Sequence, residues 1–340
     1  MLISDYTYEL PEENIAKFPP KIRGTSRLIV VDRKTGKYID SYYKNLDDFL
    51  NEGDLLILND TRVMRSRLFA QLPDGRPREL VVLEKHNNDA NHVMYRGKLH
   101  AGDVLQIKNA NTENLSTDFV TVREVLDGGI AIIDSERPLE DIVLDHGNVP
   151  LPPYLHRDAN ADDIKRYQTV WAKQLGSAAA PTASLNMTKD LLERLQKKGI
   201  KIKYLTLHVG LGTFLPIRTD NIEDHKMHSE WFNIPADTIE AIKNTRKQGG
   251  RVVALGTTVT RTLEFWGRTG KTSGEDDIFI YPGFEFKVID ALLTNFHAPK
   301  STVLMLASAF AGWEHIKAAY EHAIESDYKL LSYGDSMLIC

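Results

Sequence analysis

The stretch Gly53-Asp-Leu-Leu-Ile-Leu-Asn-Asp-Thr-Arg-Val63 marks the point at which the sequence pattern changes. Its run from Asp54 to Asn59 is typical of a buried β-strand. From about Met64 to Asp134, short β-like runs follow one another, at residues 67–71, 80–84, 92–99, 104–107, 119–125 and 129–133. Such regular short strands, separated by turns and without long helical patterns, predict a small all-β barrel or sandwich.

The segments on either side of this β-rich region have different patterns. Upstream, residues 27–32 and 38–43 predict a hairpin with a turn at Lys34-Thr-Gly36. Downstream, Gly147-Asn-Val-Pro-Leu-Pro-Pro-Tyr154 is too rich in proline for a helix and predicts an extended linker.

From about Asp162, predicted helices and strands alternate. We expect helices at residues 188–199, 236–247, 259–266 and 301–324, and strands at residues 200–207, 251–255, 278–281 and 288–294. This alternation indicates an α/β layer with at least partly parallel strands.

Composition narrows the class of protein. The chain has 340 residues and a net charge of −5, so two domains are expected and a coat-like nucleic-acid binder is disfavoured. Its single cysteine, Cys340, excludes an intramolecular disulfide, a Cys-based zinc site and an iron–sulfur cluster held by this chain alone. We see neither a membrane-spanning apolar run nor a signal peptide, and we expect a monomeric, cytoplasmic globular enzyme.

Unusual polar residues follow several predicted strands. They are His208-Val-Gly-Leu-Gly-Thr-Phe214, Gly256-Thr-Thr258 with Arg261, Tyr281-Pro-Gly283 and Asn295-Phe-His297. Each motif alone is equally consistent with ordinary turn chemistry. In open α/β sheets, however, ligands bind outside the carboxyl ends of strands, so together the motifs predict a polar crevice.

The glycines of this region do not complete a known nucleotide motif. Gly210-x-Gly212 lacks the third glycine of a dinucleotide fingerprint, because position 215 is Leu. The chain also has no P-loop motif. A conventional nicotinamide site and a P-loop ATPase are therefore disfavoured.

His225-Lys-Met-His228 allows three interpretations. On a helix the two imidazoles would share a face, and with a third ligand they would bind a metal ion, although no third ligand is obvious. A role in proton transfer or hydrogen bonding is favoured, because histidine titrates near pH ~6.5. The alternative is a pair of half-buried structural histidines.

Two basic clusters are candidates for phosphate contacts. Arg62, Arg65 and Arg67 form one, and the other is lysine-rich and lies within residues 189–203. We favour the arginines, because the lysines are at least as well explained as a solvated surface.

Taken together, these segments resemble the S-adenosylmethionine:tRNA ribosyltransferase-isomerase family almost end to end. The matching motifs include Asn59-Asp-Thr-Arg-Val63, Pro150-Leu-Pro-Pro-Tyr154, Ala179-Ala-Pro-Thr-Ala183, Leu207-His-Val-Gly210, His225-Lys-Met-His-Ser-Glu230, Ile280-Tyr-Pro-Gly283, Thr294-Asn-Phe-His297 and Tyr333-Gly-Asp335. Their order and spacing carry the resemblance.

The resemblance implies a larger mixed-sheet α/β domain (residues 1–62 and 150–340) interrupted by a smaller β-barrel domain (63–149). It also implies a reaction. The ribosyl moiety of S-adenosylmethionine would be transferred and isomerised onto the 7-aminomethyl-7-deazaguanine wobble base of a tRNA with a G-U-N anticodon, giving epoxyqueuosine-tRNA, adenine and methionine. S-adenosylmethionine would be consumed as a substrate, with no cofactor and no metal ion.

Candidate roles follow from the chemistry that this reaction needs. Imidazoles suit proton transfer, carboxylates suit a hydroxyl or an amine, and arginines suit a carboxylate or a phosphate. Candidate catalytic residues are His208, His225, His228 and Asp335. Candidate substrate-binding residues are Asp60, Thr61, Arg62, Asn186, Gly210, Gly212, Thr257, Thr258, Arg261, Asn295 and His297.

Two positions depart from the family pattern. Asn186 stands where His is common, and Leu215 stands where Arg or Gln is common. Because Asn cannot act as a base, the departure keeps a catalytically silent tRNA-binding paralogue as an alternative. The second alternative is a different S-adenosylmethionine-dependent RNA-modifying enzyme, such as a methyltransferase.

Overall fold

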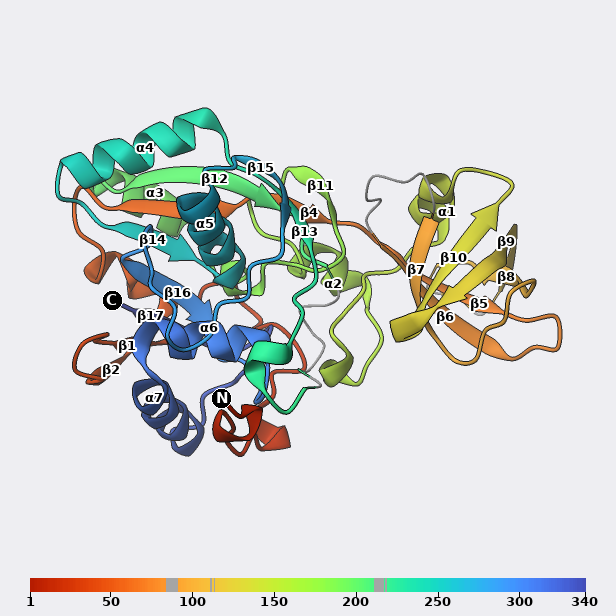
Figure 1. Cartoon of the computed structure of the whole chain (residues 1–340), viewed down its shortest axis with the longest axis horizontal. Helices are drawn as coiled ribbons and strands as arrows, with labels where there is room; N and C mark the ends of the chain where they lie inside the picture. The colour runs from red at the N-terminus through yellow and green to blue at the C-terminus, as the bar shows by residue number, and fades with distance from the viewer. Residues whose placement is uncertain (84–90, 111, 113, 211–216, 218) are drawn as a thin grey trace.

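The computed structural model describes residues 1–83, 91–110, 112, 114–210, 217 and 219–340, and it consists of two bodies (Figure 1). A larger α/β body contains both termini, and a small β-barrel lies beside it. The predicted class, a larger mixed-sheet α/β domain interrupted by a smaller β-barrel domain, is confirmed. The barrel strands lie between Arg67 and Ser135, and the exact domain limits stay a prediction.

Within the described residues, the larger body is built on a nine-stranded sheet of order β15-β13-β12-β3-β14-β16-β17-β1-β2. The strands are β1 (Arg27–Val31), β2 (Tyr38–Tyr42), β3 (Leu55–Asn59), β12 (Lys201–Leu207), β13 (Glu230–Asn233), β14 (Val252–Leu255), β15 (Ser273–Asp276), β16 (Ala291–Asn295) and β17 (Ser336–Ile339). The central strands β12, β3, β14 and β16 run parallel, so their carboxyl ends meet at one edge.

Side chains of each central strand alternate between two apolar layers. In β3, Leu55 and Ile57 face one core, while Leu56 and Leu58 face the other. The first core is covered by α4 (Ala236–Lys247), α5 (Thr257–Thr269), α6 (Thr302–Ala311) and α7 (Trp313–Glu325). The second is covered by α3 (Lys189–Lys197) and the 3₁₀ segment η3 (Tyr43–Asp48). Burial on both faces explains why these strands are continuously apolar.

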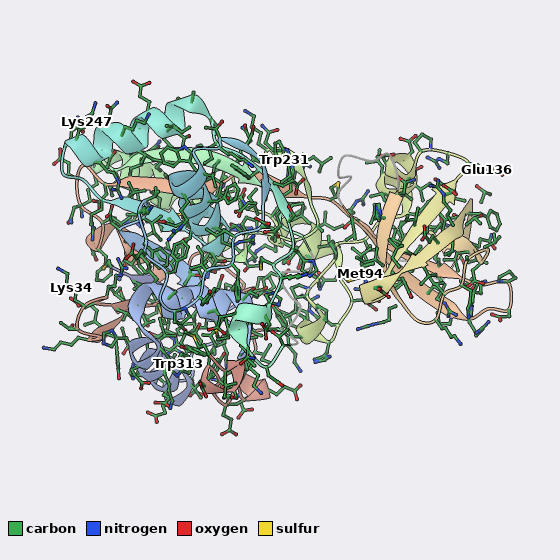
Figure 2. All side chains as sticks on the ribbon, viewed as in Figure 1. Lys34, Met94, Glu136, Trp231, Lys247 and Trp313 are labelled. Atoms are coloured by element: carbon green, nitrogen blue, oxygen red, sulfur yellow. The ribbon has the colours of Figure 1, made fainter. Side chains whose placement is uncertain are left out.

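The smaller body is a closed antiparallel barrel of order β10-β7-β6-β5-β8-β9. Its strands are β5 (Arg67–Gln71), β6 (Pro77–Val82), β7 (Asn91–Arg96), β8 (Val104–Lys108), β9 (Leu115–Leu126) and β10 (Ile130–Ser135). The interior holds alternate apolar residues of each strand, and α1 (Leu139–His146) packs against them. Figure 2 labels two barrel side chains, Met94 and Glu136.

The chain enters and leaves the barrel side by side. The backbone of Arg67 exchanges two hydrogen bonds with that of Asn148, at 3.1 and 2.7 Å. Nearby, β4 (Thr61–Val63) pairs in parallel with β11 (Gln174–Ser177). The remaining short elements are α2 (Ala161–Arg166), η1 (Ile3–Asp5), η2 (Glu12–Asn14), η4 (Asp127–Gly129), η5 (Pro153–Leu155), η6 (Thr182–Ser184) and η8 (Ile222–Asp224).

Some predicted elements were wrong. Residues 278–281 are not a strand, and the strand of that region is β15. The helical pattern at 301–324 splits into α6 and α7 at Gly312, whose φ of 90° is incompatible with a continuous helix. Among the described residues, no helix has both the length and the apolarity needed to span a bilayer.

Candidate active site

A pocket lies at the carboxyl ends of the central parallel strands. It encloses about 730 Å³ of space including its open mouth. Two strand ends form much of it: Gly256, Thr257 and Thr258 at the junction of β14 and α5, and residues 294–298 at the end of β16 and just after it. The remaining described lining residues are Tyr154, Ala180, Pro181, Thr182, Ala183, Val209, Ser301, Val303, Leu331 and Ser332. The structure therefore brings together four predicted substrate-binding residues: Thr257, Thr258, Asn295 and His297.

The described side chains that line this pocket are all uncharged at neutral pH. His297 is the one imidazole among them, and burial lowers its pKa to about 3. Its Nε2 lies 2.9 Å from Thr294 Oγ1, and its backbone N–H donates to Tyr320 Oη. His297 is therefore a neutral hydrogen-bonding group.

His208 follows β12 at the same edge of the sheet, next to the lining residue Val209 but not itself among the described lining residues, and it is held from three sides. Its Nδ1 lies 2.7 Å from Thr61 Oγ1, and its ring stacks on Trp231 with a centroid distance of 5.2 Å. Gly176 passes so close that a Cβ there would lie 2.5 Å from Nε2. Burial lowers the pKa of His208, which keeps the ring neutral and able to accept a proton. In Figure 2, Trp231 lies on the side of the larger body nearer the barrel.

Asp60 and Thr61 continue directly from β3. Asp60 accepts a hydrogen bond of 2.6 Å from Thr206 Oγ1, and burial raises the pKa of its carboxyl. The N–H of Thr61 donates a hydrogen bond to Asn59 Oδ1, and Asn59 Nδ2 donates to the Leu207 carbonyl. These contacts connect the ends of β3 and β12.

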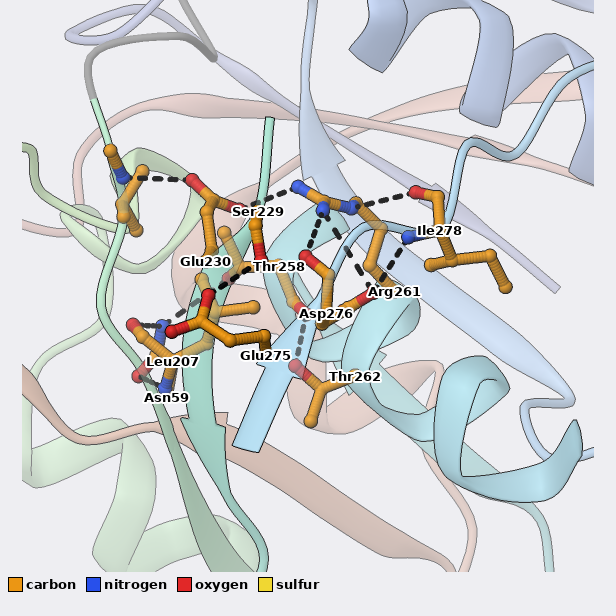
Figure 3. A network of polar contacts seen from close by, with 12 residues as sticks. Asn59, Leu207, Ser229, Glu230, Thr258, Arg261, Thr262, Glu275, Asp276 and Ile278 are labelled. Carbon is orange, nitrogen blue, oxygen red and sulfur yellow. Dashed lines mark hydrogen bonds and ion pairs between the residues drawn. The ribbon is translucent and has the colours of Figure 1, made fainter. Parts of the chain in front are cut away.

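Arg261 lies inside a buried polar network rather than on the pocket wall (Figure 3). Its Nη1 lies 2.5 Å from Glu230 Oε2, and it also contacts the carbonyl groups of Asp276 and Ile278. The other Glu230 oxygen accepts a 2.7 Å hydrogen bond from the Gly210 N–H. Arg261 is thus paired inside the protein and holds the strand end that carries Gly210.

Asn186 and Asp335 lie beside the start of β1 and β17. Asn186 accepts from Ser26 Oγ at 2.8 Å and donates to the Gly334 carbonyl at 2.9 Å. Asp335 accepts from the backbone N–H groups of Arg27 and Lys329, and burial raises the pKa of its carboxyl. Neither lines the pocket described above.

Three further candidates lie apart from the pocket. Arg62 is exposed on β4. His225 packs edge-on against Phe279, while His228 is exposed, and the segment that carries both is not helical. Within the described ranges, no group of three His, Cys, Asp or Glu residues is arranged to hold a metal ion. Gly212 lies outside the described residues.

Several polar residues of the site were not predicted individually. Tyr154 and Ser332 share a short hydrogen bond at the pocket wall, and Glu230 and Asp276 pair with Arg261. Tyr154 and Glu230 belong to motifs that carried the resemblance, so the motifs contained a signal for them. Nothing in the sequence around Asp276 predicted its role, because its contact with Arg261 depends on the order of the strands in the sheet.

The fold and the pocket are those of an α/β enzyme whose small-molecule site lies at a sheet edge. The family profile described as "Queuosine biosynthesis protein" matches residues 3–339, and the chain belongs to that family. The predicted family is thereby confirmed.

Named relatives agree with this assignment. A protein of Pelodictyon phaeoclathratiforme named S-adenosylmethionine:tRNA ribosyltransferase-isomerase is 53% identical, and the match covers 100% of both chains. A relative of the same name from Halothermothrix orenii is 44% identical over 100% of both chains. The crystal structure titled S-adenosylmethionine tRNA ribosyltransferase from Thermotoga maritima has a TM-score of 0.57 and 32% identity, with 99% of this chain and 100% of that chain covered.

Proposed function

We propose that this protein transfers and isomerises the ribosyl moiety of S-adenosylmethionine onto the 7-aminomethyl-7-deazaguanine wobble base of tRNA with a G-U-N anticodon. The products are epoxyqueuosine-tRNA, adenine and methionine. The observation that carries the proposal is the 53% identity, over the full length of both chains, to a relative whose name gives S-adenosylmethionine and tRNA as its substrates.

The site offers groups for the proton transfers that this reaction needs. The sulfonium of S-adenosylmethionine acidifies the adjacent ribose carbon, so an unprotonated base is needed to remove a proton there. His208 is suited to that task, because burial lowers its pKa and Thr61 and Trp231 orient its ring. His228 is less suited, because it is exposed to water. Burial also lowers the pKa of His225, whose ring packs edge-on against Phe279, so His225 stays the second candidate base.

The other site residues have supporting roles in this proposal. Thr257, Thr258, Asn295 and His297 bind substrate in the pocket. Arg261 and Glu230 hold the strand end at Gly210. Arg62 is exposed and available to an RNA phosphate. S-adenosylmethionine is a substrate, and the proposal includes neither a resident cofactor nor a metal ion.

The decisive experiment incubates the purified protein with S-adenosylmethionine and tRNA that carries the aminomethyl-deazaguanine base. Mass spectrometry of the digested tRNA should detect epoxyqueuosine, with adenine and methionine released in equal amounts. Release of S-adenosylhomocysteine would instead indicate a methyltransferase. tRNA binding without consumption of S-adenosylmethionine would indicate a silent paralogue. Activity should persist in a chelator, and its loss there would contradict the metal-free proposal.

A further inference from the structure

The side chain of Asn295 has one satisfied end and one unsatisfied end. Its Nδ2 donates to the Asp335 carbonyl at 3.4 Å, and because only the amide nitrogen can donate to a carbonyl, this contact sets the orientation of the amide. The residue is 2% exposed, and its Oδ1 has no partner among the described residues. A buried acceptor without a partner costs free energy, so a ligand that enters the pocket and donates to Oδ1 gains affinity.

The first turn of α5 adds unsatisfied donors to the same pocket. The helix has 13 residues, and its N-cap, Gly256, provides no side-chain cap. Within the described residues, no acceptor is bonded to the N–H groups of Thr257, Thr258 or Val259. In contrast, α6 is capped by Ser301, which accepts from Leu304 N–H. The pocket therefore presents several donors and one buried acceptor to its ligand.

The lack of charged groups in the described lining favours one end of S-adenosylmethionine over the other. Its amino-acid end carries an ammonium group and a carboxylate, whereas its nucleoside end is uncharged. No carboxylate lies among the described lining residues, and a buried ammonium group without one is costly. Apolar lining residues such as Pro181, Val303 and Leu331 suit a flat base. The nucleoside end fits this lining better than the amino-acid end.

Access decides which part of the nucleoside reaches Asn295. In the proposed reaction the ribose carbons bond to a base of a large RNA, so the ribose must lie near the mouth of the pocket. The adenine forms no bond to the RNA and leaves the ribose with a proton on a ring nitrogen, so it is free to lie deeper in the pocket, against the buried Asn295. An adenine ring carries both a donor amine and acceptor nitrogens, which matches the groups described above.

We propose that this pocket binds the nucleoside end of S-adenosylmethionine, with Asn295 Oδ1 accepting a hydrogen bond from the adenine 6-amino group and the N-terminus of α5 donating to the nucleoside. The inference rests on the proposed function, which supplies the identity of the substrate. Asn295 is thus a specificity-determining residue for adenine.

The test compares two uncharged probes by calorimetry in the presence of tRNA: 5′-deoxy-5′-methylthioadenosine and the same compound with hydrogen in place of the 6-amino group. The wild-type protein should bind the amino compound about 10-fold or more tightly, as expected for one well-placed hydrogen bond. Asn295→Ala should bind both compounds equally. A preference that persists unchanged in the folded variant would overturn the proposal.

A matched control removes a similar buried amide elsewhere. Asn14 is 3% exposed and donates to the Tyr328 carbonyl at 2.9 Å, and it is not among the described lining residues of this pocket. Asn14→Ala should keep the preference for the amino compound. If Asn295→Ala does not fold, the wild-type protein still decides the matter, because equal binding of the two probes would contradict the proposal.

Two further measurements distinguish a failure of the adenine site from a failure of the proposed reaction. Methionine should not displace methylthioadenosine, and displacement would assign the pocket to the amino-acid end instead. Adenine release from S-adenosylmethionine is measured separately with the substrate tRNA. If the probe preference behaves as expected but no adenine is released, the proposed reaction fails while the adenine site stands. If adenine is released but the wild-type protein shows no preference between the probes, the adenine site fails alone.

Discussion

Arg261 and Glu230 form an ion pair inside the protein, with Nη1 and Oε2 2.5 Å apart and both side chains at most 5% exposed. A second carboxylate, Asp276, lies 3.9 Å from the same guanidinium. The pair joins α5 to β13, and through the Gly210 N–H it reaches the strand end that follows β12. One arginine therefore balances two buried acids beside the candidate site.

We expect Arg261→Met to destabilise the protein strongly. Methionine fills much of the space but leaves Glu230 and Asp276 without their cation, which costs about 3–5 kcal/mol for a broken buried pair. Urea unfolding measures the loss. Arg123 pairs with Asp134 on the exposed surface of the barrel, so Arg123→Met serves as the control and should leave the unfolding midpoint unchanged. Equal effects of the two substitutions would contradict the role of Arg261.

The pH dependence of stability should include a contribution from His297. Burial lowers its pKa to about 3, below the ~6.5 of an unfolded histidine. Between these values the unfolded chain binds a proton that the folded chain does not, so the free energy of unfolding decreases as pH falls. His297→Gln should reduce this slope by up to about 1.4 kcal/mol per pH unit.

Asp276 changes the free energy of unfolding with pH in the opposite direction over much of the same pH range. Burial raises the pKa of Asp276 to about 6, so its contribution to stability decreases as pH rises from ~3.8 to 6. The comparison of His297→Gln with the wild type cancels this contribution. Unfolding curves measured from pH 4 to pH 7 provide the slopes, with the exposed His100→Gln as control. Identical slopes in His297→Gln and the wild type would exclude a neutral buried His297.

The position of His208 can be tested without replacing it. In Gly176→Ala, the new Cβ would lie 2.5 Å from His208 Nε2, and the ring must move away from Thr61 or Trp231. If His208 transfers a proton, turnover should fall by about 10²–10⁴-fold while substrate affinity changes less. Single-turnover measurements separate the two effects.

The control for backbone strain is Gly274→Ala. Gly274 also has a positive φ, +125° compared with +156° at Gly176, but an added Cβ there would meet nothing within 4 Å. Gly274→Ala should therefore keep its turnover. A folded Gly176→Ala protein with normal turnover would remove His208 from the catalytic assignment.

Salt dependence of tRNA binding should single out Arg62 from the predicted basic cluster. Arg65 donates to the Leu144 carbonyl, and Arg67 is paired with Glu79 and Asp158. Arg62 is exposed, so Arg62→Gln should reduce the slope of log affinity against log salt by about 1. Arg65→Gln should change the slope less. A slope that responds to Arg65→Gln and not to Arg62→Gln would reverse this assignment.

Asn186 should contribute to stability more than to substrate binding. Its amide bridges Ser26, Gly334 and Ser336, so Asn186→Ala leaves buried groups unpaired and should cost about 1–3 kcal/mol. The affinity for S-adenosylmethionine should stay within about threefold of the wild type, a change of under ~1 kcal/mol. A large loss of affinity with unchanged stability would place Asn186 in the binding site, where the sequence had predicted it.

Sequence patterns predicted the central architecture because apolar strands and strand-end motifs are local signals. Thr257, Thr258, Asn295 and His297 share a pocket because they lie at or just after the carboxyl ends of two neighbouring parallel strands, β14 and β16. The burial of Arg261 was not predictable, since its partners come from β13 and the end of β15 and meet it only through the sheet order. The strand β13 was also missed, because four residues, EWFN, are too short to establish a period.

The strand order of the larger sheet has a consequence for how the chain folds. β3 ends at Asn59, but its neighbours β12 and β14 begin at Lys201 and Val252, and β17 completes the sheet with Ser336–Ile339. The barrel, in contrast, is assembled from strands within one stretch of about seventy residues, from Arg67 to Ser135. During synthesis, the barrel is therefore able to fold while β3 is still unpaired. We expect the larger sheet to close late and slowly, with the apolar β3 strand as the segment most exposed to misassociation before then.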